Sequence, residues 1–193
     1  MAPAVPASKS DRYWVVPAAR AIAALALTAV ITFTRDTHTA AFGLIVFGVF
    51  AVVDGLVTAG LSIPFAPRGV TRILFAVQGC IGVIAGVLAL SLAGSGLGLF
   101  LYLVTVWAAL TGFLELYNGL RNRGKDAAAR DWLVTGVLTA VLAITFLLIP
   151  ADAVLAIGLL GTWAVVVGVF QGIGAASLRT TARAHDADQG AGA

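Results

Sequence analysis

The sequence is poor in the residues that carry most enzyme and metal chemistry. Its 193 residues include one cysteine, one methionine and two histidines, and only 11% are Asp, Glu, Lys or Arg. A single cysteine excludes an intramolecular disulfide, and so little Cys and His forms no metal motif of the usual kind. The sequence also lacks a P-loop, a nucleophile elbow and an HExxH motif. We therefore expect no enzyme activity, no cofactor and no metal.

What the sequence has instead is hydrophobic residues, which make up 60% of the chain. Soluble domains contain about half apolar and about a quarter charged residues, so lipid is the expected solvent here. Six apolar stretches are each close to the ~20 residues that a helix needs to cross ~30 Å of hydrocarbon. The sequence predicts an all-α membrane protein with six transmembrane helices. The stretches are 13–33, 40–61, 70–93, 97–119, 131–150 and 153–177.

The basic residues are distributed unequally between the two sides of this pattern. Eleven of the twelve Lys and Arg residues lie on the side that holds both termini, and Arg35 alone lies on the other. The positive-inside rule then places both termini in the cytoplasm. The net charge of +3 reflects these boundary positions and forms no basic stripe, so we expect no nucleic-acid partner. The eleven are Lys9, Arg12, Arg20, Arg68, Arg72, Arg121, Arg123, Lys125, Arg130, Arg179 and Arg183.

The chain repeats at an interval of about 57 residues. Gly55, Gly112 and Gly168 align, each with an aromatic residue five positions earlier and a polar residue three positions later. We expect three repeated helical hairpins, over about 13–61, 70–119 and 131–177, within one transmembrane domain of residues 13–179. Residues 1–12 and 180–193 are expected to be disordered cytoplasmic tails. The aromatic residues are Phe50, Trp107 and Trp163, and the polar residues are Thr58, Glu115 and Gln171.

Four charged residues fall within the apolar stretches or at their edges. Arg20 and Asp54 share one depth in the first hairpin, and Arg72 and Glu115 share another in the second. A charge in hydrocarbon costs at least ~2.5–3.5 kcal/mol, so pairing is expected. We expect the pairs Arg20–Asp54 and Arg72–Glu115. They are either static pairs with snorkelling arginines or part of a proton or ion relay.

Glycine pairs at GxxxG spacing indicate where helix backbones come close. Gly82 and Gly86 form one pair and Gly168 and Gly172 another. Small residues drive helix association in lipid, where the hydrophobic effect between helices is absent. These four glycines are candidate packing positions, within the chain or between subunits.

The stretch from Trp107 to Arg121, WAALTGFLELYNGLR, resembles the fourth helix of the HdeD family of bacterial acid-resistance membrane proteins. Three further stretches are similar: Val53-Asp54-Gly55, Trp132 through Gly136 to Pro150, and Gly161 to Gly168. Together they extend over nearly all of residues 13–179. The resemblance implies a six-helix protein of the bacterial plasma (inner) membrane, linked to acid stress in some members. It brings no catalytic residues with it.

Three functions follow as hypotheses. The first is a non-enzymatic multi-pass protein of the HdeD type that supports acid or envelope stress resistance. The second is a small transporter or channel with Asp54 and Glu115 in a proton or ion path. The third is an accessory subunit of a membrane complex. The expected partners are the lipid bilayer and either a second copy of the chain or another membrane protein.

Overall fold

The computed structural model describes residues 13–34, 37–65, 69–126 and 128–191, and all the regular structure in these ranges is helical. The expected six helices are confirmed, each within a few residues of its apolar stretch except at the end of the last. Residues 1–12, the first predicted tail, lie outside the described residues, as do Arg35 and Arg68. The helices are α1 (Val15–Phe33), α2 (Ala40–Phe65), α3 (Val70–Ser91), α4 (Leu97–Arg121), α5 (Ala129–Leu148) and α6 (Ala153–Ala191).

All six helices are long and apolar enough to cross a membrane. Their outward faces carry large apolar side chains, such as Phe33, Leu148 and Ile22, which are 70% or more exposed. Exposed apolar surface on this scale does not occur on a monomeric soluble protein. The helices therefore imply a lipid bilayer environment, and the chain is a multi-pass membrane protein.

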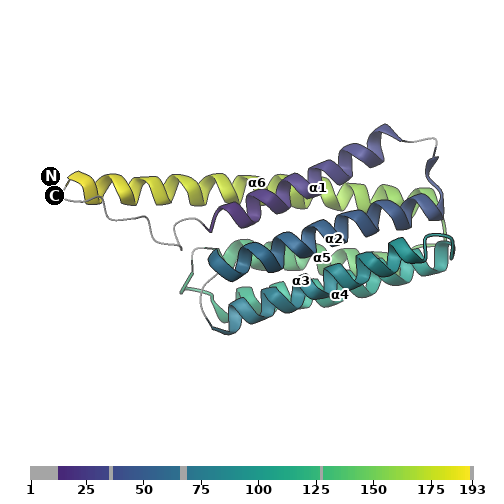
Figure 1. The fold of residues 1–193 in the computed structure, drawn as a ribbon, viewed down its shortest axis with the longest axis horizontal. Coiled ribbons are helices and arrows are strands. Elements are labelled where there is room, and N and C mark those ends of the chain that lie inside the picture. Colours follow the sequence, from purple (N-terminus) through teal and green to yellow (C-terminus); the bar gives the residue numbers. More distant parts are fainter. Residues whose placement is uncertain (1–12, 35–36, 66–68, 127, 192–193) are drawn as a thin grey trace.

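The helices form one antiparallel bundle (Figure 1). Each helix contacts its neighbours in the chain, and α1 also packs on α6, which closes the bundle into a ring. The most extensive contacts join α2 to α3, α4 to α5 and α6 to α1. The hairpins expected from the sequence, α1–α2, α3–α4 and α5–α6, are packed less extensively. The most extensive packing is therefore between helices of different expected hairpins.

Glycines account for this choice of partners. A Cβ atom at Gly79 on α3 would lie 2.5 Å from the backbone oxygen of Gly55 on α2, and one at Gly136 on α5 would lie 2.7 Å from the backbone nitrogen of Leu116 on α4. Only glycine allows two helix backbones to come this close. Gly168 on α6, which aligns with Gly55 and Gly112 in the sequence, faces the side chains of α1.

The predicted packing glycines lie at these interfaces within the chain. Gly82 and Gly86 on α3 face the backbone of α2, and a Cβ at Gly86 would lie 2.6 Å from the oxygen of Gly48. A Cβ at Gly168 would lie 2.9 Å from Leu25 on α1. Gly172 is less constrained, because its Cβ would be 3.9 Å from Ala21, an ordinary van der Waals distance.

The three aromatic residues of the repeat meet at the centre of the bundle. Phe50, Trp107 and Trp163 contact each other edge to face, with ring centroids 5.5–5.8 Å apart. Edge-to-face geometry places the positive edge of one ring against the negative face of the next. The inward faces of α2, α4 and α6 therefore converge at equivalent positions, and this convergence brings other equivalent residues together as well.

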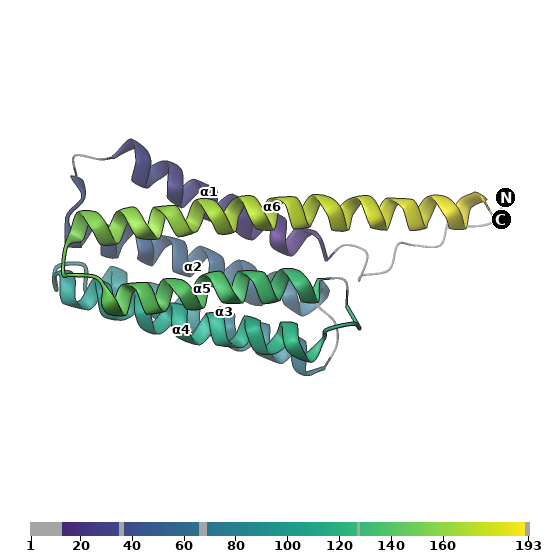
Figure 2. The same ribbon diagram turned by 180° about the vertical axis from the view of Figure 1, so that it is seen from behind.

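The last helix is longer than the sequence predicts. α6 continues to Ala191, where a disordered tail was expected from residue 180, and it projects beyond the other helices (Figures 1 and 2). This segment contains four alanines and one arginine, and both residue types are among the best helix formers. Once the preceding turns are formed, each added residue extends the helix without a new nucleation step.

Candidate functional site

One arginine holds two carboxylates inside the bundle. The Nε of Arg20 donates a hydrogen bond to Asp54 Oδ1 at 2.9 Å, and its Nη1 donates to Glu115 Oε1 at 2.6 Å. The side chains of Arg20, Asp54 and Glu115 are 13%, 8% and 2% exposed. Charge-assisted hydrogen bonds of this kind are roughly twice as strong as neutral ones. The three residues connect α1, α2 and α4.

A glutamine extends the network to a fourth helix. The side-chain nitrogen of Gln78 on α3 donates to Glu115 Oε1 at 2.8 Å, so this oxygen accepts two hydrogen bonds. Gln78 is 1% exposed and stands immediately before Gly79. The close approach at Gly79 therefore carries Gln78 into the core. We call Arg20, Asp54, Glu115 and Gln78 the charge network.

The structure brings together the first expected pair and rearranges the second. Arg20 lies against Asp54, as the shared depth suggested, whereas Glu115 is bound by Arg20 and Gln78. Arg72, the partner expected for Glu115, is half-buried near the start of α3. Depth in the membrane predicts which residues share a level, but it does not say which faces of the helices meet. On α3, the residue that reaches Glu115 is Gln78.

Sequence reasoning did not single out Gln78, although a signal for it was present. The residues immediately before the facing glycines Gly55 on α2 and Gly79 on α3 are Asp54 and Gln78, and both are buried in the network. A polar residue next to a packing glycine is drawn to the helix interface with it. This spacing, rather than charge, is the pattern that would have identified Gln78.

A small cavity of about 20 Å³ lies beside the charge network. That volume is enough for about one water molecule. Thr58, Glu115 and Gln171, the three equivalent polar residues of the repeat, all line it. The same convergence of α2, α4 and α6 that stacks the aromatic residues therefore gathers these polar side chains. The remaining lining residues are Tyr13, Val16, Pro17, Arg20, Phe75, Ala128, Asp131, Trp132, Thr135 and Leu178.

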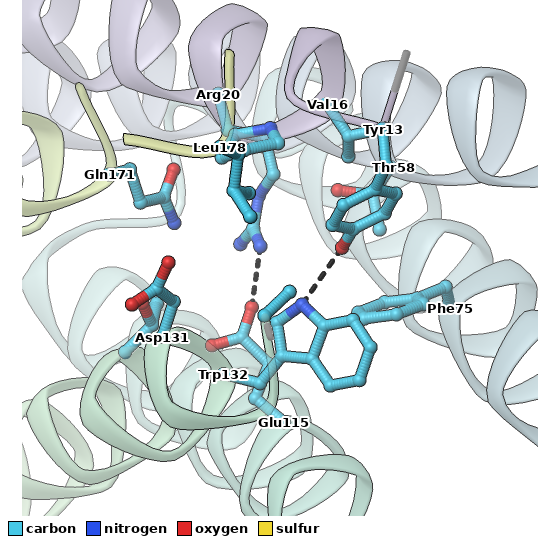
Figure 3. A pocket seen from close by; sticks show the side chains of 13 residues that line it. Tyr13, Val16, Arg20, Thr58, Phe75, Glu115, Asp131, Trp132, Gln171 and Leu178 are labelled. Atoms are coloured by element: carbon cyan, nitrogen blue, oxygen red, sulfur yellow. Dashed lines mark hydrogen bonds and ion pairs between the residues drawn. The ribbon is translucent and has the colours of Figure 1, made fainter. Parts of the chain in front are cut away.

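Three buried oxygens at this cavity have no hydrogen-bond partner among the described residues. They are Glu115 Oε2, Gln171 Oε1 and Thr58 Oγ1, and their residues are 1%, 4% and 1% exposed. Most buried polar atoms in native proteins are satisfied, so each such atom requires a reason. Figure 3 shows the free oxygen of Glu115 directed toward the side on which Asp131 and Gln171 lie. These oxygens can accept hydrogen bonds or coordinate a cation.

Aromatic residues border the other side of the cavity (Figure 3). Trp132 Nε1 donates to the Tyr13 hydroxyl at 2.8 Å, and the Trp132 ring meets Phe75 edge to face at 5.2 Å. Burial raises the pKa of the Tyr13 phenol above its ordinary value of 10.0. Tyr13 therefore remains neutral at physiological pH and adds no charge to the site. The rings of Tyr13 and Trp132 also meet edge to face, with centroids 5.9 Å apart.

Asp131 is the acidic residue at the outer part of the cavity. It is half-buried in the first turn of α5. A Cβ atom at Gly174 on α6 would lie 2.7 Å from Asp131 Oδ2. Because glycine has no side chain, the Asp131 carboxylate can pack directly against α6. Asp131 thus stands between the end of the bundle and Glu115.

The opposite half of the bundle core is apolar in the part of the chain that the structure describes. Its fully buried side chains include Phe47, Phe100 and Leu44 on α2 and α4, and Ile157 on α6. The buried acidic residues of the described ranges are Asp54 and Glu115, and both belong to the charge network, not to this half. The polar site is therefore confined to the end of the bundle at which α1 begins and α4 ends.

Residues 77–148 match the model of a family described as a short repeat of unknown function (DUF308). This is the domain of HdeD-type proteins. The matched segment runs from α3 through α5 and contains both Gln78 and Glu115. No curated protein and no solved structure matches the chain. The chain is thus a multi-pass membrane protein in which residues 77–148 are similar to the DUF308 repeat.

Proposed function

We propose that the chain is a non-enzymatic membrane protein of the HdeD type that supports resistance to acid or envelope stress. The DUF308 match over residues 77–148 supports this proposal. So does the charge network, which ties α1, α2, α3 and α4 together through Glu115. In this proposal the protein lies in a bacterial plasma membrane with both termini in the cytoplasm, as the distribution of Lys and Arg favours.

The charge network is the observation that carries the proposal. Removing one partner from a buried ion pair costs about 3–5 kcal/mol, because the other charge is left uncompensated. Arg20 has two carboxylate partners, so the loss of either ion pair leaves it the other. A network of this composition can lose one ion pair and still join two helices through Arg20. That property suits a protein that must stay folded in an acid-stressed membrane.

Survival at low external pH tests the proposal. A deletion strain would be complemented with the wild type, with Asp54→Asn plus Glu115→Gln, or with Asp152→Asn, at matched membrane levels. Asp152 is an exposed residue between α5 and α6, remote from the network, so its variant controls for loss of a charge. We expect rescue by the wild type and by Asp152→Asn only. Failure of the well-expressed wild type to rescue would contradict the proposed role.

A small transporter or channel is the second candidate, and the cavity at Glu115 favours it. An ion or proton site requires oxygens that have no other hydrogen-bond partner, and here three helices supply them around a space the size of one water molecule. The apolar opposite half of the core argues against a continuous path within one chain. Flux in liposomes that contain the purified protein separates the two candidates, since a transporter must move a solute and an HdeD-type structural protein need not.

A further inference from the structure

The charge network carries more negative than positive charge. An arginine side chain stays protonated in proteins, so Arg20 supplies one positive charge against the two carboxylates it binds. With both carboxylates ionised, the three side chains have a net charge of −1. A net charge in hydrocarbon costs at least ~2.5 kcal/mol, and one bound monovalent cation removes it.

The cavity provides a place for that cation. It adjoins Glu115 Oε2, which has no partner among the described residues, while Oε1 already accepts two hydrogen bonds. Gln171 Oε1 and Thr58 Oγ1 line the same space and are also unpartnered within the described ranges. The volume of about 20 Å³ admits one species of the size of water. These three residues from three helices, together with Asp131 on α5, therefore surround a site for a small cation.

The other charged residue that lines the cavity makes the site more negative. Of the described residues that line the cavity, Arg20 is the one cation, and Asp131 adds a further carboxylate. Arg72 on α3 is half-buried but does not belong to the lining, and Arg130 beside Asp131 is exposed.

On α6, Arg179 is the cation whose side chain the structure describes. The guanidinium of Arg179 lies 4.9 Å from the ring centroid of Trp14, where a cation–π contact holds it. Tyr13 is neutral because burial raises the pKa of its phenol. Neither group therefore supplies a counter-charge to Glu115.

We propose that the cavity beside Glu115, Asp131 and Gln171 binds one monovalent cation no larger than a water molecule. The cation is either a proton, carried on Glu115 Oε2 with a water molecule in the cavity, or a desolvated sodium ion. Both neutralise the charge network and satisfy the free oxygens. Mg²⁺ is disfavoured, because it gives up its hydration shell reluctantly. The proposal goes beyond the stress role and does not depend on it.

Thermal unfolding of the purified full-length protein in lipid nanodiscs tests the proposal. At constant ionic strength, NaCl is exchanged for choline chloride, whose cation is too large for the cavity, at pH 7.5 and again at pH 5. A ligand that binds only the folded state raises Tm with its concentration. We expect about 3–6 °C for each tenfold rise above half-saturation. A rise with Na⁺ identifies sodium, and a rise with acidity that is indifferent to Na⁺ identifies the proton.

Variants assign the response to this cavity. Glu115→Gln removes the excess charge and should abolish the dependence of Tm on the cation, and Asp131→Asn and Gln171→Leu should weaken the apparent affinity at least several-fold. Asp152→Asn, the matched change at the opposite end, should leave the response unchanged. Gln171→Leu keeps every charge, so it remains informative even where Glu115→Gln does not fold.

Two results would overturn the proposal. One is a wild-type Tm that responds to neither Na⁺ nor acidity. The other is a response that Gln171→Leu and Asp131→Asn leave as it is in the wild type. For the proton, infrared spectroscopy supplies a second readout, since the carbonyl band of a protonated carboxylic acid must be present in the wild type and missing from Glu115→Gln.

Discussion

Arg20 and Glu115 are 95 positions apart in the chain, and their side chains meet at 2.6 Å inside the bundle. This contact requires the first helix to reach the fourth across the centre of the fold. It exists because α1 packs against α6 and closes the ring, which turns Arg20 inward. A single guanidinium thereby connects residues from the first and second sequence repeats.

Loss of Arg20 should destabilise the protein more than loss of any exposed arginine. Arg20→Met leaves Asp54 and Glu115 buried without their shared counter-charge, which we expect to cost about 3–5 kcal/mol. Thermal unfolding in nanodiscs measures the effect. Arg121→Gln at the exposed end of α4 is the control and should change stability by no more than ~0.5 kcal/mol.

The double variant Arg20→Met plus Glu115→Gln should recover part of this loss. It removes one of the two buried carboxylates that Arg20→Met leaves without a counter-charge, so one uncompensated charge remains instead of two. A double variant no more stable than Arg20→Met alone would show that the 2.6 Å contact contributes little energy.

Gln78 should be a structural member of the network although it carries no charge. Gln78→Leu removes a donor to Glu115 Oε1, and we expect a loss of about 1–3 kcal/mol. Thr139→Val on α5 is the matched control, because among the described residues the Thr139 hydroxyl bonds the carbonyl of Thr135 in its own helix and no other group. Equal unfolding temperatures for the two variants would contradict a role for Gln78.

Tyr13 should titrate well above the ordinary tyrosine range. Its pKa is raised by burial, so the folded protein holds the phenolic proton more tightly than the unfolded chain does. The stabilisation is present below about pH 10 and is lost as the pH rises through the folded pKa. Tyrosinate absorbance near pH 10 should therefore be the same in the wild type and in Tyr13→Phe. A larger tyrosinate signal in the wild type would show that Tyr13 is accessible.

The fold was largely predictable from sequence, and the site was predictable in part. Helices in lipid are marked by their own composition and length, so all six were identified without knowledge of their partners. The alignment of Phe50 with Trp107 and Trp163 anticipated residues that meet at the core. The partner of Glu115 was not predictable, because it depends on how α1 and α3 are rotated about their axes. That rotation is set by packing between repeats.

Gly→Ala substitutions should destabilise the protein at glycines that face the backbone of another helix, and should be tolerated at glycines that do not. Gly79→Ala places a Cβ atom 2.5 Å from the oxygen of Gly55, and neither backbone can move without separating α2 from α3. We expect a loss of at least ~1–3 kcal/mol, the usual cost of overpacking, measured by thermal unfolding in nanodiscs.

Gly158→Ala is the matched control on α6, since nothing lies within 4 Å of its Cβ position. Alanine is the better helix former by up to ~1 kcal/mol, so this change should be neutral or stabilising. Gly172→Ala should also be tolerated, because its Cβ would lie 3.9 Å from Ala21. If Gly79→Ala proved as harmless as Gly158→Ala, the closest approach of two helices in the bundle would not be what selects α2 and α3 as partners. Packing between repeats would then need another cause, such as the aromatic contacts of Phe50, Trp107 and Trp163.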